Sequence, residues 1–210
     1  MSICYIIGAG ELPLLYIKDN KQSLIIAADG GLEHLGEQKP NIIVGDFDSL
    51  GYIPDSPNTV ILPTEKDLTD MKYATKIGIE KGFKTFILYG GTGGRVDHTF
   101  ANISLICFLA EKGYRGYLIG DGMIITAIKN TSIKLPKKKE GTVSVFTAGE
   151  SAFGVTIKGL KYTLSNYTLK FSQALGVSNS YIGQDAEISV KDGTLIVMFQ
   201  EDVKNFIDNL

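Results

Sequence analysis

The stretch TFILYGGTGGRVDHTFANISLICFLAEKG, residues 85–113, decides the fold. Its first five residues, Thr85 to Tyr89, predict a buried strand, and the glycines that follow end that strand. Apolar residues then recur every three or four positions, which predicts an amphipathic helix from Val96 to Lys112 that ends at Gly113. The residues on the apolar face of this helix are Val96, Phe100, Ile103, Cys107 and Ala110.

Runs of strand length recur on both sides of this stretch. They are apolar without alternation, which is typical of strands buried on both faces of a parallel sheet. A helical pattern from Thr69 to Lys81 lies between two of them. Strands alternating with helices indicate a doubly wound α/β unit. The predicted strands are Ile3 to Ile7, Leu24 to Ala28, Ile42 to Val44, Val60 to Leu62, Thr85 to Tyr89 and Gly116 to Ile119.

The pattern changes after about residue 126. Lys129 to Gly141 is polar and basic, and we interpret it as a solvated loop. Asp192-Gly193 predicts a hairpin turn between the last two strands. We therefore expect an α/β domain over residues 1–128 and an antiparallel β domain over residues 129–210. The strands of this second domain are predicted at Thr142 to Thr147, Gly154 to Ile157, Thr168 to Phe171, Glu187 to Val190 and Thr194 to Phe199.

The composition favours a small-molecule partner. The 210 residues include 21 basic and 23 acidic side chains, so the charge gives no sign of nucleic-acid binding. The two cysteines, Cys4 and Cys107, are too few for a disulfide framework, and we expect buried thiols in a reducing compartment. No apolar run reaches the roughly 18 residues of a membrane span, and the first residues do not resemble a signal peptide. A cytoplasmic location is expected.

Acidic residues follow several of the predicted strands. Asp29 ends one strand, Asp46 and Asp48 follow the next, and Asp67 and Asp70 begin the helix after another. Ligands of open α/β sheets bind outside the carboxyl ends of the strands, where these carboxylates would gather and hold Mg²⁺. Each group also has a structural interpretation: Asp46 and Asp48 in a solvent turn, and Asp67 as an N-cap with Asp70 in the first helical turn.

The glycine-rich loop that precedes the second helix favours phosphate. Its backbone N–H groups and the helix N-terminus can bind phosphate oxygens, although the loop is neither a Walker A motif nor a Rossmann fingerprint. Lys66 and Arg95 would add positive charge. For Asp97 and His98, the alternatives are a partner of the helix dipole and a surface residue. A polyphosphate bound through Mg²⁺ is the predicted ligand.

In order and spacing, four blocks of the chain resemble the motifs of the thiamine pyrophosphokinase family, bacterial type. They begin at Ala28, Gly45, Lys66 and Gly90, and the last, GGTGGRVDH, is specific. In the second half, Gly159 to Tyr162 and Leu175 to Asn179 resemble the thiamine-binding domain of that family. The resemblance implies an α/β catalytic domain followed by a β-sandwich, a homodimer, and transfer of the diphosphoryl group of ATP to thiamine.

The resemblance also implies roles for individual residues. It assigns catalysis and Mg²⁺ binding to Asp46, Asp48, Asp67 and Asp70. It assigns ATP binding to Asp29, Lys66, Thr92, Gly93, Arg95, Asp97 and His98. The segments on the thiamine side contain Tyr162, Ser178 and Asn179, and the Tyr162 ring could attract the thiamine cation.

Two other functions remain open from the residues alone. A Mg²⁺-dependent nucleotide hydrolase or phosphotransferase would use the same acidic edge, but it gives no reason for the second domain. A noncatalytic thiamine- or nucleotide-binding protein would not require so many carboxylates around an anionic ligand.

Overall fold

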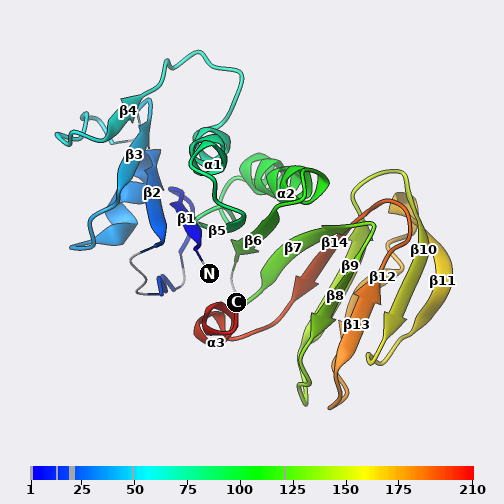
Figure 1. The fold of residues 1–210 in the computed structure, drawn as a ribbon. Helices are drawn as coiled ribbons and strands as arrows, with labels where there is room; N and C mark the ends of the chain where they lie inside the picture. Colours follow the sequence, from blue (N-terminus) through cyan, green and yellow to red (C-terminus); the bar gives the residue numbers. More distant parts are fainter. Residues whose placement is uncertain (1, 13, 19–21, 49, 121) are drawn as a thin grey trace. The chain divides into compact units, whose positions relative to one another are not determined.

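The computed structural model of the chain describes residues 2–12, 14–18, 22–48, 50–120 and 122–210 (Figure 1). Within the chain, contacts separate two units. Unit 1 takes Met1–Asn102, Gly116–Asp121 and Val203–Leu210, and unit 2 takes Ile103–Arg115 and Gly122–Asp202. The α/β elements belong mainly to unit 1, and the antiparallel strands belong to unit 2.

Unit 1 is built on parallel strands. The strand order is β6-β5-β1-β2-β3-β4, and β1 pairs in parallel with both β2 and β5. Every residue of β1 and β5 is buried, as the unbroken apolar runs predicted. The six predicted strands are confirmed, with bounds β1 (Cys4–Ile7), β2 (Leu24–Ala28), β3 (Ile42–Gly45), β4 (Thr59–Ile61), β5 (Thr85–Tyr89) and β6 (Arg115–Ile119).

The chain changes direction across this sheet at β1. From β1 it proceeds through β2, β3 and β4 on one side, and then returns to place β5 on the other side of β1. The connections that follow β1 and β5 therefore diverge. In open α/β sheets, a crevice forms at such a switch point, outside the carboxyl ends of the strands.

Short helical segments follow three of the parallel strands: η1 (Asp29–Leu35), α1 (Asp70–Glu80) and α2 (Val96–Glu111). A last helix, α3 (Val203–Asp208), ends the chain. The N-cap of α1 is Thr69, whose hydroxyl oxygen accepts from the backbone N–H of Lys72 at 3.3 Å. The alternative interpretation of Asp67 as the N-cap is therefore wrong, because Thr69 takes that place.

The predicted apolar face of α2 is wrong at its N-terminal end. Val96 is 82% exposed and Phe100 is 68% exposed, although Cys107 is buried as expected. The buried residues of this helix include Leu105, Ile106 and Leu109. A three-to-four spacing fits more than one face of a helix that is apolar on most sides, so the pattern did not determine which face is buried.

Apart from Ile103–Arg115, unit 2 consists mainly of antiparallel strands in two groups, as expected for a β-sandwich. The strand order is β12-β9-β14-β7 in one and β11-β10-β13-β8 in the other. The predicted strands are confirmed, and several more are present. The bounds are β7 (Ile124–Lys129), β8 (Ser132–Leu135), β9 (Thr142–Thr147), β10 (Ser151–Lys158), β11 (Leu164–Lys170), β12 (Gly176–Ser180), β13 (Ala186–Ser189) and β14 (Thr194–Phe199), with the short helix η2 (Phe171–Gln173).

Two expectations for unit 2 are wrong. Asp192-Gly193 does not close a hairpin, because β13 and β14 belong to different sheets and the turn carries the chain from one to the other. The basic segment expected to be a loop contains β8, in which Leu135 is buried while Lys134 is exposed. The two-residue alternation of β8 is short and includes a lysine. The basic charge of the segment therefore favoured a loop in the prediction.

Both cysteines are free and buried, as expected. Within the described ranges, no helix is long and apolar enough to cross a membrane.

Candidate active site

A pocket of about 510 Å³ opens in unit 1 at the carboxyl ends of β1, β2 and β5. This is the switch point of the parallel sheet, where the topology leads us to expect a ligand. Its lining comes from four parts of the chain. They are the segment Gly8–Glu11 after β1, Ala28 and Asp29 after β2, Thr69–Met71 at the start of α1, and the loop Gly90–Arg95 with His98, Ala101 and Asn102 of α2.

The two glycine-containing loops of the pocket are in direct backbone contact. The N–H of Gly8 donates to the Tyr89 carbonyl, and the N–H of Gly10 donates to the Gly90 carbonyl, each at 2.8 Å. A Cβ atom on Gly90 would lie 2.1 Å from the Gly8 carbonyl oxygen, and Gly90 has a φ of +60°. Only glycine allows both the backbone conformation and the close approach.

Sequence reasoning missed the first of these loops. Gly8 and Gly10 follow the first predicted strand directly, as the later glycines follow theirs. That position was the signal, because glycines at the carboxyl end of a central strand allow the backbone to approach a ligand.

Asn102 is a second residue that sequence reasoning missed. Its buried side chain on α2 donates a hydrogen bond from Nδ2 to the Gly91 carbonyl at 2.9 Å. The glycine-rich loop is thus tied to the second turn of the helix that follows it. An asparagine on the helical face toward the preceding loop carries no motif of its own, so only the structure identifies it.

The charged residues beside the glycine-rich loop form a pair. Arg95 donates to both carboxylate oxygens of Asp97, at 3.2 and 2.6 Å. This hydrogen bond holds the pKa of Asp97 below its usual range. Both side chains are exposed, so the pair is open to solvent. Of the residues that the resemblance assigned to ATP binding, Asp29, Thr92, Gly93, Arg95 and His98 line the pocket.

Lys66 joins two of the predicted carboxylates. Its ammonium lies 2.6 Å from Oδ2 of Asp46 and 2.8 Å from Oδ1 of Asp70, and only 8% of the lysine side chain is exposed. The hydrogen bond from Lys66 lowers the pKa of Asp46. Burial raises the pKa of Asp70 despite its contact with Lys66, and the negative charges of Asp46 and Asp29 add to that rise. We refer to Asp46 and Asp70, which both contact Lys66, as the acidic pair.

The turn between Asp46 and Asp48 is fixed by Phe47. This residue has a φ of +61° and its ring is buried. A bulky residue seldom adopts this backbone conformation, and such outliers concentrate at functional sites. The backbone N–H of Asp48 donates to Asp46 at 3.4 Å. Ser49, which ends the block that begins at Gly45, lies outside the described residues.

Asp48 and Asp67 are exposed, in contrast to Asp46 and Asp70. Among the residues that the structure describes, no three His, Cys, Asp or Glu side chains are grouped as a metal site would require. The four predicted metal ligands thus divide into one pair held by Lys66 and two exposed carboxylates.

The residues predicted to contact thiamine lie in unit 2. Tyr162 is 61% exposed, and the Lys161 ammonium lies 5.4 Å from the centroid of its ring. The buried Asn179 holds the backbone of Tyr162: its Oδ1 accepts from the Tyr162 N–H at 2.9 Å, and its Nδ2 donates to the Tyr162 carbonyl at 2.6 Å. The backbone N–H of Ser178 donates to the Ser144 hydroxyl. Asn179 is therefore occupied in positioning Tyr162.

Comparisons with known proteins agree over both halves of the chain. The family model described as thiamin pyrophosphokinase, catalytic domain, matches residues 18–118, and the one described as thiamin pyrophosphokinase, vitamin B1 binding domain, matches residues 130–195.

Individual relatives have modest identity and long coverage. Thiamin pyrophosphokinase 1 of Caenorhabditis elegans is 23% identical over 206 residues, covering 91% of this chain and 84% of that protein. Thiamine pyrophosphokinase of Bacillus subtilis is 27% identical over 165 residues, or 75% of this chain and 77% of the relative. The crystal structure of the Bacillus subtilis thiamine pyrophosphokinase superposes with a TM-score of 0.83 and 26% identity, covering 97% of this chain and 100% of that chain. This chain therefore belongs to the thiamin pyrophosphokinase family.

Proposed function

We propose that the protein transfers the diphosphoryl group of ATP to the hydroxyl oxygen of thiamine, giving thiamine diphosphate and AMP. One observation carries this proposal: two glycine loops, Asp29 and Asp70 border a single pocket at the switch point of the parallel sheet. Exposed backbone N–H groups suit phosphate oxygens, and carboxylates suit a divalent cation. A nucleotide hydrolase would need the same groups, but the match to the vitamin B1 binding domain favours thiamine as the acceptor.

The phosphates of ATP are assigned to the loop Gly90–Gly94 and the N-terminus of α2. The hydrogen bond from Asn102 holds the loop, so its N–H groups need no rearrangement to bind. Arg95 lines the pocket, and its exposed pair with Asp97 can exchange for a phosphate contact at little cost in free energy. Residues 1–128 would thus form the nucleotide-binding domain and residues 129–210 the thiamine-binding domain.

The reaction requires the protein to position the two substrates more than to form covalent bonds with them. The thiamine hydroxyl oxygen must lie in line with the β-phosphorus, forming one oxygen–phosphorus bond as the bond to the AMP oxygen breaks. A carboxylate among Asp46, Asp48, Asp67 and Asp70 would accept the hydroxyl proton. Positive charge from Arg95 and Lys66 would offset the charge that develops on the phosphate oxygens.

The two carboxylates held by Lys66 suit a magnesium ion that would take further ligands from phosphate and water. Lys66 already acts as a stand-in cation, since both carboxylates of the acidic pair hold its ammonium by direct contact. Two carboxylates share one ammonium, which leaves an excess of negative charge, and the donor atoms are hard oxygens. Asp46 and Asp70 would hold Mg²⁺, joined by Asp48 and Asp67 from their exposed positions. Bound there, Mg²⁺ would neutralise phosphate charge.

Thiamine and the homodimer complete the proposal. The exposed face of Tyr162 would bind the thiamine cation in place of the Lys161 ammonium.

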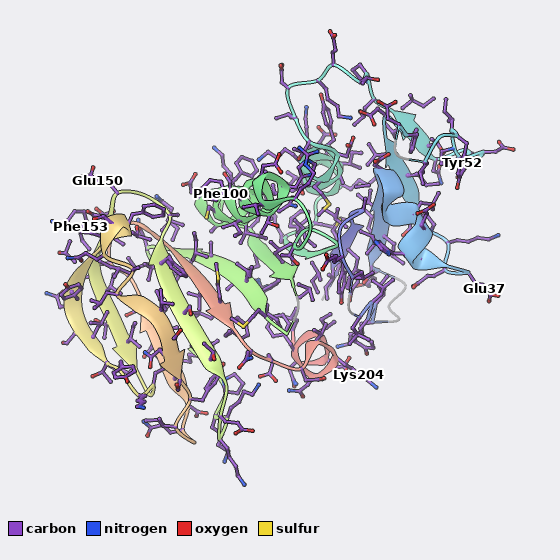
Figure 2. The ribbon with its side chains drawn as sticks, turned by 180° about the vertical axis from the view of Figure 1, so that it is seen from behind. Glu37, Tyr52, Phe100, Glu150, Phe153 and Lys204 are labelled. Carbon is purple, nitrogen blue, oxygen red and sulfur yellow. The ribbon has the colours of Figure 1, made fainter. Side chains whose placement is uncertain are left out.

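Large exposed apolar side chains favour a partner subunit that covers them. They include Phe100, labelled in Figure 2, and Val96 in unit 1, with Phe171, Leu175 and Val177 in unit 2.

The test is to incubate the purified protein with ATP, Mg²⁺ and thiamine and to separate the products by chromatography. AMP formed in equal amount to thiamine diphosphate is the expected result. ADP with thiamine monophosphate would indicate a simple kinase, and nucleotide breakdown without thiamine a hydrolase. Nucleotide and thiamine binding without any turnover would indicate a binding protein. Sedimentation velocity of the same sample tests the homodimer.

A further inference from the structure

Lys66 occupies the place in unit 1 where a metal ion is proposed. It lies between β4 and α1, while its partners Asp46 and Asp70 follow β3 and begin α1. The Lys66 ammonium therefore joins the segment after β3 to the start of α1. Because the lysine side chain is almost fully buried, solvent screens this contact far less than a surface ion pair.

The lysine and a metal ion compete for the same two carboxylates. Oδ2 of Asp46 is 2.6 Å from the Lys66 ammonium, whereas Mg²⁺ requires its oxygen ligands at about 2.0–2.1 Å in a nearly ideal octahedron. An ammonium and a divalent cation this close to each other also repel. Metal binding to these two carboxylates therefore requires the Lys66 ammonium to move away.

A polyphosphate supplies the reason for that movement. Asp70 lines the pocket and contacts Lys66 directly, so the lysine is one contact away from the proposed phosphate site. The flexible four-carbon stem of a lysine allows its ammonium to change partners, and phosphate oxygens are strong partners for it.

We propose that Lys66 is an internal counter-cation. In the absence of nucleotide, it prevents Mg²⁺ from binding to Asp46 and Asp70, and it releases both carboxylates when nucleotide phosphates bind its ammonium. The inference rests on the proposed function, because it assumes that nucleotide and metal share this site. Metal then enters with the nucleotide and not before it. The same ion pairs join the segment after β3 to the start of α1.

The experiment measures Mn²⁺ binding to the nucleotide-free protein by the electron paramagnetic resonance signal of free Mn²⁺. Lys66→Met removes the charge and keeps the length of the side chain. We expect it to bind Mn²⁺ at least about tenfold more tightly than the natural sequence, since a unit charge a few ångströms from a divalent ion is worth more than one decade of affinity. Lys66→Arg keeps the charge and should bind as weakly as the natural sequence.

Two controls identify the site. Lys76→Met removes an exposed lysine of α1 and should change Mn²⁺ affinity less than about twofold, because distant exposed charges are screened. Adding Asp46→Asn to Lys66→Met should abolish the gained affinity. Thermal unfolding gives a second measurement: Lys66→Met should melt at lower temperature than the natural sequence without metal, and Mn²⁺ should raise its melting temperature more.

Equal Mn²⁺ affinity of the natural sequence and Lys66→Met would overturn the role of Lys66 while leaving the proposed function intact, provided that ATP still promotes Mn²⁺ binding. If no variant binds Mn²⁺ with or without ATP, the metal site of the proposed function fails, and the role of Lys66 fails with it. Should Lys66→Met not fold, Lys66→Gln replaces it in the same measurements.

Discussion

Replacing Gly90 with alanine tests the contact between the two loops at the switch point. The added Cβ would lie 2.1 Å from the carbonyl oxygen of Gly8, and Gly90 has a φ of +60°. A real Cβ atom does not approach an oxygen closer than about 3.0 Å, so the loop after β1 must retreat by roughly 1 Å. Two backbone hydrogen bonds of 2.8 Å between these loops would then be stretched beyond bonding distance.

The expected loss of stability has two parts. The left-handed backbone costs alanine about 1–2 kcal/mol. The steric clash adds about 1–3 kcal/mol, the usual cost of inserting a methyl group into a packed site, and the two weakened hydrogen bonds, each worth about 1 kcal/mol, fall within that range. The total is therefore about 2–5 kcal/mol.

Gly94→Ala is the matched control. Gly94 lies in the same loop with a φ of +56°, and a Cβ there meets nothing within 4 Å. It carries the backbone cost without the clash. Urea unfolding followed by circular dichroism should show Gly90→Ala less stable than Gly94→Ala by about 1–3 kcal/mol. Equal losses of stability would refute the close backbone contact between the two loops.

Three further predictions concern other residues. Asp48→Asn should lower turnover by about a hundredfold or more while the melting temperature stays native, because charge stabilisation at a reacting centre is lost; near-native turnover would remove Asp48 from the site. Tyr162→Ala should raise the thiamine KM by about 2- to 30-fold, the range of a cation–π contact, and change the ATP KM little; equal changes in both constants would indicate a structural role. Burial raises the pKa of Tyr89, whose hydroxyl donates to the Tyr16 carbonyl at 2.6 Å. The unfolded chain loses this proton first, above about pH 10, so stability present below that pH should fall as the pH rises further. The urea midpoint between pH 8 and 11 measures this fall, and a Tyr89→Phe variant that falls as steeply would contradict it.

The parallel sheet was predictable because its strands are buried on both faces. Cys4–Ile7 and Thr85–Tyr89 have no exposed residue, so the apolar runs mark their bounds directly. The acidic and glycine-rich residues were predictable for a related reason, since parallel strands bring the connections at their carboxyl ends to one edge.

The remaining features depend on contacts distant in sequence. Asp192-Gly193 has the residues of a hairpin turn, but pairing partners elsewhere in the chain place β13 and β14 in different sheets. The exposure of Phe100 depends on which face of α2 the other elements cover. The ion pairs of Lys66 could not be predicted, because a lysine between a strand and a helix is usually solvated. Its burial here depends on contacts with Asp46 after β3 and Asp70 in α1.

A single nitrogen atom of the Asn179 amide holds the Tyr162 carbonyl in place. Hydrolysis of this amide would replace the nitrogen that donates to the Tyr162 carbonyl at 2.6 Å with an oxygen, so that two acceptors would face each other in a buried place. Stored enzyme would then separate into two charge forms on isoelectric focusing. Only the form that retains the amide would hold Tyr162 in place, so a gradual loss of thiamine affinity would accompany the appearance of the more acidic form.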